Sequence, residues 1–261
     1  MKVIQKTLIA TSTLAILGAY SLFANADTFT QTYSVDSGEL LFLKTDVGSI
    51  NIQTHSSDTV EIEVEVTGDD ADEFDVKFEQ TSSGVSIYGE REDDSGWNGN
   101  SMRVKFYLNV PEEYNVDLDT SGGSIKIEDL TGNVDARTSG GSIALGDIVG
   151  NVEVDTSGGS IKVDSVYGEI DANTSGGSIK VEFKKQITED AKLSTSGGSI
   201  TAILPEDIEI DISASTSGGK VSTEFNVDGR IKKRSIKGKI NGGGPELILR
   251  TSGGSVRVNQ S

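Results

Sequence analysis

The chain has 261 residues, of which 41 are acidic and 23 basic, so its formal net charge is −18. This acidity argues against a general nucleic-acid-binding function, and the absence of cysteine excludes disulfides, cysteine-ligated metals and a lipid-modified cysteine. With only 3 prolines and many Val, Ile, Thr and Gly residues, the composition indicates a β-rich chain, not a disordered one.

Residues 1–26 have the features of a secretory signal peptide. Lys2 and Lys6 precede an apolar run, and the small-residue stretch 24–26 offers a cleavage site before Asp27. A retained membrane anchor is the alternative, but the apolar run is short for a spanning helix. The sequence therefore predicts an exported protein, periplasmic, secreted or at the cell surface, with no transmembrane segment after cleavage.

Residues 27–119 are predicted to form longer, irregular β coils. Alternation of apolar and polar residues runs through 61–66 and 103–110, and TDVGSINI at 45–52 places two isoleucines after a threonine. We expect these coils to cap a regular stack, with a separate small β-sandwich as the alternative.

The same region holds two acidic loops, GDDADEFD at 68–75 and EREDDSGWNGN at 90–100. No cofactor is predicted, and calcium is left open for these loops, although neither has EF-hand spacing. Trp97 in the second loop is either a glycan-stacking residue or a cap over the end of the coil. His55, the sole histidine, lies in the polar stretch QTHSSD and is interpreted as an exposed loop residue.

Residues 120–261 repeat one motif. TSGG corners begin at seven threonines, spaced by 18, 18, 18, 21, 21 and 35 residues: Thr120, Thr138, Thr156, Thr174, Thr195, Thr216 and Thr251. The last spacing is interpreted as two coils of which one has lost its motif. A Pro-Glu segment at Pro111 and another at Pro205 each precede a corner.

Each unit predicts two short strands joined by glycine corners. In the second unit Ile143 and Leu145 alternate with Ala144, which makes the aliphatic residues inward and Ala144 outward. Stacked units would place like residues above one another at the roughly 4.8 Å spacing of paired strands. Gly-Gly would permit a positive φ and close approach of coils, and the inward threonines would form a hydroxyl-bonded column.

We therefore predict an all-β, right-handed parallel β-solenoid of 18–21-residue repeats. A calcium-binding nonapeptide coil is disfavoured because no aspartate follows the glycines. A hexapeptide coil is disfavoured because aliphatic residues do not recur every six positions. Outward rows such as Asp119, Arg137 and Asp155 are interpreted as charge pairs across coils, and Lys126 with Glu128 as compensation on a solvated face.

Charge is distributed unevenly along the chain. Net charge is −17 for residues 27–119, −9 for 120–219 and +6 for 220–261. If sequence order equals position along a solenoid, one end is acidic and the other basic. Six basic residues are candidates for contact with an anionic partner, the alternative being protection of a terminal edge: Arg230, Lys232, Lys233, Arg234, Lys237 and Lys239.

The seven corners, Val110-Pro111-Glu112 and the stretch NGGGP at 241–245 together resemble the putative adhesin family of exported or membrane-tethered bacterial proteins of unknown function. The resemblance covers nearly all of residues 27–261. It implies a β-solenoid fold and supplies no catalytic residues.

Three functions compete. The first is a non-enzymatic exported scaffold in surface or envelope interactions, as an adhesin, with glycans, the envelope surface or proteins as partners. The second is a polysaccharide lyase or hydrolase on a β-helix, which would need a carboxylate pair in a protected cleft. The third is a structural self-assembly module. The oligomeric state does not follow from the sequence.

Overall fold

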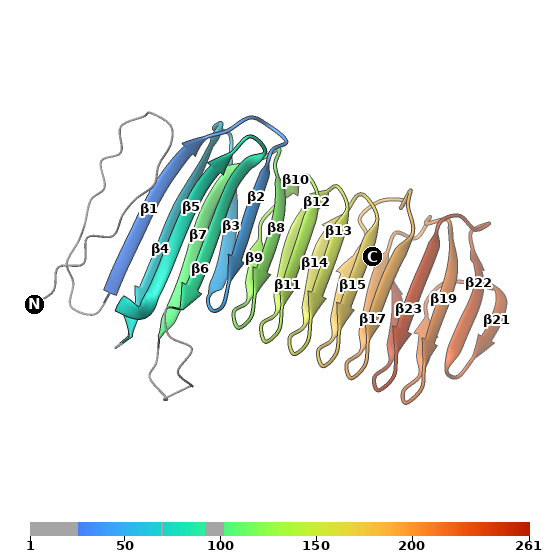
Figure 1. Ribbon diagram of the computed structural model, residues 1–261. Helices are drawn as coiled ribbons and strands as arrows, with labels where there is room; N and C mark the ends of the chain where they lie inside the picture. The colour runs from blue at the N-terminus through green and yellow to red at the C-terminus, as the bar shows by residue number, and fades with distance from the viewer. Residues whose placement is uncertain (1–25, 69, 92–101) are drawn as a thin grey trace, which may run out of the picture.

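The structure is a computed structural model, and it describes residues 26–68, 70–91 and 102–261. Within these residues nearly all regular structure is β-strand, with one short 3-10 helix, η1 (Ala71–Glu73). The strands form two long sheets, here called sheet A and sheet B, along an elongated molecule (Figure 1). The all-β prediction is confirmed. The predicted signal peptide lies outside the described residues except for Ala26, where β1 begins.

Sheet A consists in spatial order of β1 (Ala26–Ser34), β4 (Thr59–Thr67), β7 (Arg103–Pro111), β3 (Ser49–His55), β9 (Ile125–Ile127), β12 (Ile143–Val149), β14 (Ile161–Val166), β16 (Ile179–Glu182), β18 (Ile200–Leu204), β24 (Val256–Gln260) and β20 (Val221–Thr223), with β10 (Leu130–Thr131) beside β12. Sheet B consists of β21 (Asp228–Lys232), β22 (Ser235–Ile240), β19 (Ile210–Thr216), β23 (Glu246–Thr251), β17 (Ala191–Thr195), β15 (Ile170–Thr174), β13 (Val152–Thr156), β11 (Val134–Thr138), β8 (Asn115–Thr120), β2 (Leu40–Thr45), β6 (Gly84–Arg91) and β5 (Phe74–Thr81). The core lies between the two sheets.

One coil is a strand of sheet B, a corner and a strand of sheet A. In the coil of β11 and β12, Val134, Ala136, Ile143 and Leu145 are all buried, because alternate side chains point into the core. Neighbouring coils stack in parallel register, with Ile143 opposite Ile125 and Ile161. The predicted strands and inward faces are confirmed for these coils.

The order of coils along the molecule differs from the order in sequence. The coil of β23 and β24 lies between the coil of β17 and β18 and the coil of β19 and β20. The coil of β2 and β3 likewise lies between the coil of β6 and β7 and the coil of β8 and β9. The premise that sequence order equals axial position is therefore wrong at both ends.

The two Pro-Glu segments are where the chain passes over one coil position. After Pro111 it leaves β7 and enters β8, and after Pro205 it leaves β18 and enters β19. The coil passed over at Pro111 was made earlier in the sequence, and the coil passed over at Pro205 comes later. The two Pro-Glu segments, which look alike in the sequence, therefore make the same topological step.

Both ends of the stack carry antiparallel strands, so the sheets are mixed and the expectation of a wholly parallel solenoid is wrong there. At one end β1 and β7 flank β4 in antiparallel pairs, and β5 is antiparallel to β6. At the other end β21 and β22 form a hairpin that pairs with β19. This hairpin accounts for the length of the 35-residue spacing between Thr216 and Thr251. The interpretation of that spacing as two coils, one of which has lost its motif, is therefore wrong. The hand of the coil stays a prediction.

The threonine column differs from the predicted hydroxyl-to-hydroxyl chain. Thr138 Oγ1 donates to the carbonyl oxygen of Gly123 in the neighbouring coil at 2.7 Å, and accepts from the Gly141 N–H at 3.2 Å. Thr251 makes the same bond to Gly198, 53 residues earlier in the chain, at 2.7 Å, which supports the inserted coil independently of the strand pairing. Each buried hydroxyl thus joins two coils through a glycine.

The glycine pairs of the TSGG corners permit close approach of coils and do not adopt a positive φ. Among the glycine pairs of the seven TSGG corners none has a positive φ, whereas Gly48 in the TDVG corner has a φ of 130° and Gly132 and Gly150, at the opposite corner of their coils, have φ values of 151° and 156°. The second glycine is the crowded one, since a Cβ on Gly141 would overlap the carbonyl oxygen of Gly123. A Cβ on Gly140 would meet nothing nearer than 3.7 Å.

Candidate interaction surfaces

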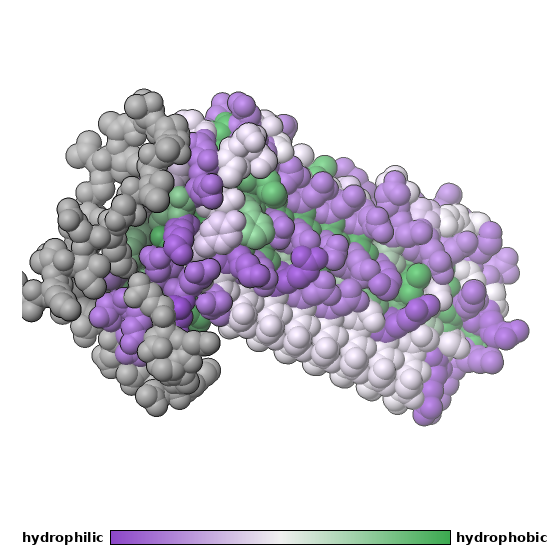
Figure 2. Space-filling model, in the orientation of Figure 1, coloured by the Kyte–Doolittle hydropathy of each residue, from purple (hydrophilic) through white to green (hydrophobic). Residues whose placement is uncertain are grey.

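The corners form a regular ridge along one side of the molecule. Their first serines are exposed in every TSGG unit: Ser121, Ser139, Ser157, Ser175, Ser196, Ser217 and Ser252. Figure 2 shows the ridge as a pale band of intermediate hydropathy. The second serines are structural, because the Ser124 Oγ accepts from the Ser142 N–H at 3.2 Å and the pattern repeats in later coils. The ridge therefore presents an exposed first serine in every TSGG unit, and in four of them the second serine, although hydrogen-bonded, is exposed as well: Ser124, Ser142, Ser160 and Ser178.

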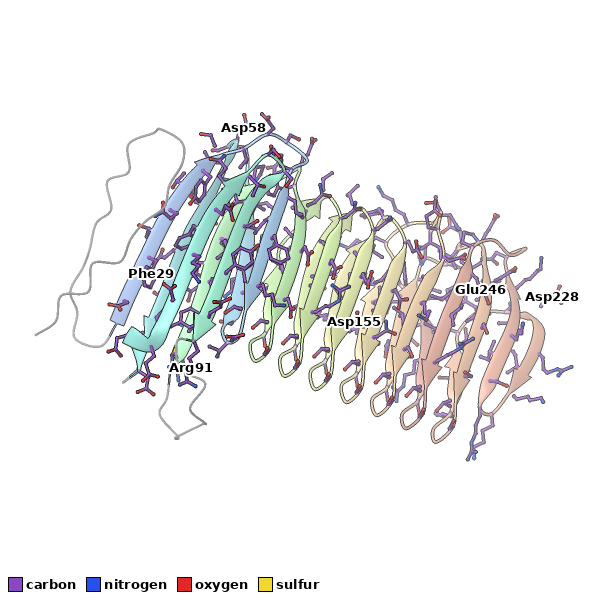
Figure 3. The ribbon with its side chains drawn as sticks, in the orientation of Figure 1. Phe29, Asp58, Arg91, Asp155, Asp228 and Glu246 are labelled. Atoms are coloured by element: carbon purple, nitrogen blue, oxygen red, sulfur yellow. The ribbon has the colours of Figure 1, made fainter. Side chains whose placement is uncertain are left out.

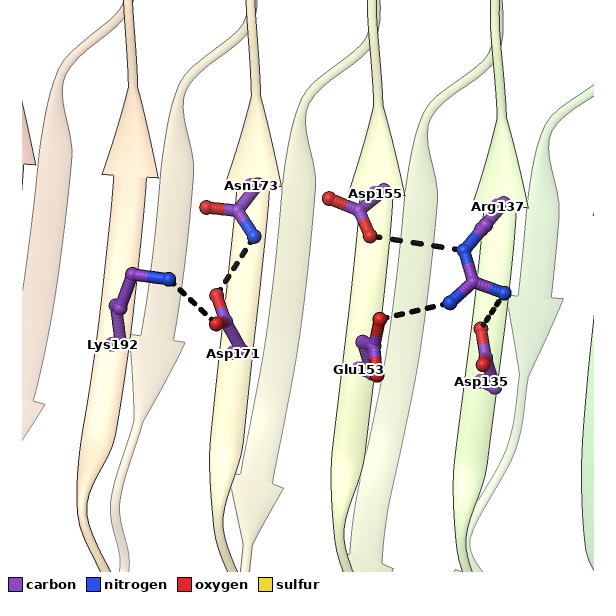
Figure 4. A network of polar contacts seen from close by, with 7 residues as sticks. All are labelled: Asp135, Arg137, Glu153, Asp155, Asp171, Asn173 and Lys192. Atoms are coloured by element: carbon purple, nitrogen blue, oxygen red, sulfur yellow. Dashed lines mark hydrogen bonds and ion pairs between the residues drawn. The ribbon is translucent and has the colours of Figure 1, made fainter.

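The outer face of sheet B carries charged residues in rows across the strands. Arg137 is flanked in register by Asp119 and Asp155, as predicted. Its shortest ion pairs, however, are with Asp135 and Glu153, both at 2.8 Å, while Asp155 lies at 4.0 Å (Figure 4). Asp135 and Glu153 were not predicted as its partners, although their outward parity beside Arg137 could have indicated them.

Two of these carboxyls are partly buried. Burial raises the pKa of Asp135 above its ordinary value, against the opposing effect of Arg137. Burial also raises the pKa of Asp155, and the hydrogen bond from Asn173 opposes that rise. A shallow hollow beside these residues is bordered by Asp119, Asn173 and the corner serines. Asp135, whose pKa is raised, pairs with the Arg137 guanidinium, and Asp155 accepts a hydrogen bond from the Asn173 amide. The row is therefore a ladder of ion pairs and hydrogen bonds across the strands.

The outer face of sheet A shows the predicted charge compensation in two places. Lys126 pairs with Glu128 at 3.3 Å, and Lys162 pairs with Asp164 at 2.6 Å. Between them Ala144 and Gly146 are small, which leaves a shallow hollow over β12. These side chains are half-buried or exposed. The geometry is that of a solvated face.

The six candidate basic residues gather on the hairpin of β21 and β22 and its turn, at the far end of sheet B. All six are exposed, and Lys239 lies 4.0 Å from Asp211. The alternation in RIKKRSIK also places Ile231 beside Ile236, and Ile231 is 58% exposed. Ile231 was not among the candidates from the sequence. Contact of the six basic residues with an anionic partner stays a prediction.

The remaining sequence candidates have varied positions. His55 ends β3, is half-buried, and its Nε2 lies 2.8 Å from the Thr59 carbonyl oxygen, so it is not the exposed loop residue that was expected. Trp97 and most of the second acidic loop lie outside the described residues, as does Asp69 of the first.

Within the described part of the chain, no group of three or more His, Asp and Glu residues is arranged to hold a metal ion. Nor do these residues include a helix with the length and apolarity to cross a membrane.

A family model described as Toastrack DUF4097 matches the chain twice, at residues 41–167 and 133–259. The first match contains the Pro111 segment and the second contains the Pro205 segment, so each includes one passage over a coil. No curated protein matches the chain.

Solved structures that the chain matches include a putative cell adhesion protein from Clostridium sporogenes ATCC 15579 (16% identity, 90% of this chain and 100% of that one, TM-score 0.39). A putative adhesin from Bacteroides fragilis NCTC 9343 is 12% identical over 90% of this chain and 97% of that one, with a TM-score of 0.38. A putative lipid binding protein from Parabacteroides distasonis ATCC 8503 is 16% identical over 91% and 97%, with a TM-score of 0.38. With identities and TM-scores this low, none of the three indicates what this chain binds.

Proposed function

The chain belongs to the Toastrack DUF4097 family, and we propose that it is an exported, non-enzymatic scaffold that binds a repetitive partner at the cell surface or in the envelope. Partners with a matching repeat are glycans and surface proteins. The signal peptide predicted for residues 1–26 supports the location.

The observation that carries this proposal is the repetition of one outer surface along the stack. Every TSGG coil presents an exposed serine at the same corner, at the spacing of paired strands, roughly 4.8 Å. A surface that repeats in one direction offers many weak, equivalent contacts to a partner that repeats in the same direction, and such contacts add through multivalency.

A polysaccharide-acting enzyme is supported less well. A hydrolytic carboxylate pair needs a defined separation in a cleft that shapes the sugar. In the described residues the two hollows are shallow, and Arg137, Lys126 and Lys162 each pair with carboxylates beside them. These carboxylates compensate charge.

The test is a binding panel of envelope polysaccharides and surface proteins with residues 27–261. Ser157→Glu combined with Ser175→Glu puts two charges on the ridge and should weaken binding by about tenfold or more, because it disrupts adjacent equivalent contacts. Ser56→Glu with Ser57→Glu, exposed residues in the turn after β3, should leave binding unchanged.

Equal binding by both double variants would show that the corner ridge does not contact the partner. Release of new reducing or unsaturated sugar ends from any polysaccharide in the panel would show that the protein is a hydrolase or a lyase and would overturn the proposed non-enzymatic function.

A further inference from the structure

Sheet B ends in two strands with one open side each. In the residues that the structure describes, no strand pairs with the outer side of β21 or with the outer side of β5. The two strands lie at opposite ends of the molecule: Figure 3 labels Asp228, the first residue of β21, at one end and Phe29, on the end strand β1, at the other. All five residues of β21 are exposed. Strand edges of this kind are templates for pairing with another chain.

Strand direction makes the two edges compatible. β5 is antiparallel to β6, which runs in the direction of the coil strands of sheet B. β21 is antiparallel to β22, which is itself antiparallel to β19, so β21 runs in the coil direction. A second copy shifted along the axis without rotation therefore presents its β5 antiparallel to β21, with outer faces on the same side.

One register of this pairing places opposite charges at both outward positions of β21 that face β5. Arg230 stands opposite Asp75 and Asp228 opposite Lys77, while Lys232 lies past the end of β5, next to the acidic helix η1 that ends at Glu73. A shift by two residues in one direction puts Arg230 opposite Lys77, and a shift in the other direction puts Asp228 opposite Asp75. Like charges directly opposite destabilise a strand pair and unlike charges stabilise it, so the charges select a single register.

The inward positions of the same register are apolar or small. Ile231 stands opposite Phe74, Gly229 opposite Val76, and Val227 opposite Phe78. Ile231 is 58% exposed in the single chain, and Val76, Phe78 and Val227 are partly buried hydrophobic residues packed against the core. Pairing of the two edges would cover these side chains and continue the core from one copy into the next.

We propose that copies of this chain associate head to tail, β21 of one copy pairing antiparallel with β5 of the next. The basic hairpin and the acidic stretch at 70–79 steer the approach. The contact joins two different surfaces and leaves both outer edges open, so it propagates as a linear filament. This association is independent of what the corner ridge binds.

The test uses residues 27–261 in sedimentation velocity and negative-stain microscopy at low and high salt. The wild type should form linear oligomers at low salt that dissociate at high salt, as screening shortens the range of the charges. Arg230→Glu alone and Asp75→Arg alone should each weaken association by about tenfold or more, because each creates a like-charge pair in the register.

Mixing the two variants should restore oligomers, because the carboxylate introduced at position 230 of one copy then faces the guanidinium introduced at position 75 of the other. The control is Arg257→Glu, an exposed charge reversal on β24, inside the stack, which should associate like the wild type. Circular dichroism melts will show that all variants fold.

A wild type that stays monomeric at low salt, or a mixture that stays monomeric, overturns the proposal. Salt-sensitive binding of monomers to anionic vesicles or to acidic glycans, without oligomers, would assign the hairpin to that partner instead.

Discussion

The second glycine of each corner packs its Cα against the backbone of the next coil. At Gly141 a Cβ would overlap the carbonyl oxygen of Gly123, the same oxygen that accepts the Thr138 hydroxyl. At Gly140 the nearest atom lies at 3.7 Å, an ordinary contact. The two adjacent glycines therefore have different physical roles.

Gly141→Ala should destabilise the protein by about 2–4 kcal/mol, because the backbones of two coils must separate and a threonine hydrogen bond is strained. Gly140→Ala should change stability by less than about 1 kcal/mol, since the methyl group faces solvent. Chemical denaturation of both variants measures the difference. Equal losses would show that corner glycines are needed for their conformation and not for close approach.

Asp135 makes stability depend on pH. Since burial raises its pKa in the fold, the native state binds more protons than the unfolded state, and the ionised carboxyl costs stability above its ordinary pKa of 3.8. Below that value it is protonated in both states and the cost vanishes.

Asp135→Asn should therefore be more stable than the wild type at pH 7 by less than about 1 kcal/mol, and the gain should disappear near pH 3. Arg137 keeps Glu153 as a partner at 2.8 Å in this variant. Denaturation at both pH values checks the sign. A variant less stable at pH 7 would mean that the Arg137 pair outweighs burial.

The elements that set the order of coils are the two Pro-Glu segments and the NGGGP turn. Asn241 has a φ of 49°, and its amide donates to the carbonyl oxygens of Glu206 and Ile208 at 3.0 and 2.9 Å. The turn is thereby held against the Pro205 segment, and the chain is directed back from the end hairpin into β23. Two elements far apart in sequence thus fix one topological step.

Asn241→Gly retains access to positive φ and removes both hydrogen bonds, so it should cost about 1–2 kcal/mol. Asn241→Ala adds the cost of a strained φ and should lose more. Thermal unfolding of both variants, with exposed Asn226→Ala as the control, measures this. No loss in the glycine variant would show that the amide contacts are dispensable.

The repeat elements could be predicted from the sequence because alternation determines which side chains are inward, as at Ile143 and Ala144. The order in which the coils lie beside one another could not be predicted. The TSGGSV corner at Thr251 has the same local pattern as the others, and nothing in it indicates that Thr195 and Thr216 flank it. The sequence of the hairpin at 228–240 alternates between apolar and polar residues as a coil does, so the alternation alone predicts a coil there.

At the surface, the row of Asp119, Arg137 and Asp155 was predictable from the repeat. The choice of Asp135 and Glu153 as the closest partners of Arg137 depends on side-chain geometry and was not.

At the scale of the whole molecule, the coil of β23 and β24 is interior although its strands come last in sequence order. Its buried side chains Leu247, Leu249, Val256 and Val258 are all 0% exposed. In a stack built in sequence order, loss of the last coil would remove an end. Here it would leave an empty position between two coils.

A chain ending at Pro245 should therefore lose the cooperative unfolding of its C-terminal coils, since burial of each of those side chains contributes about 1.5–3 kcal/mol against a typical total stability of about 5–15 kcal/mol. A chain ending at Asn259 keeps all four side chains and should unfold like the full chain. Amide hydrogen exchange across β17 to β20 resolves the effect. Native-like protection of β19 in the shorter chain would contradict the observed coil order.

The interior position of the final coil also has a consequence for the order of synthesis. A ribosome completes residues 210–240 before residues 246–260 exist. Until then β19 and β20 either remain unpaired with the stack or pair directly with β17 and β18, and in the second case this pairing has to break before β23 and β24 can insert. Only a polypeptide synthesised past Gln260 supplies β23 and β24, which occupy this position. A product terminated before Glu246 keeps four unpaired strand edges beside an empty position, those of β17 and β19 in sheet B and of β18 and β20 in sheet A. Exposed backbone of this kind is open to proteolysis. The topology thus makes the integrity of the C-terminal half depend on translation having passed β24.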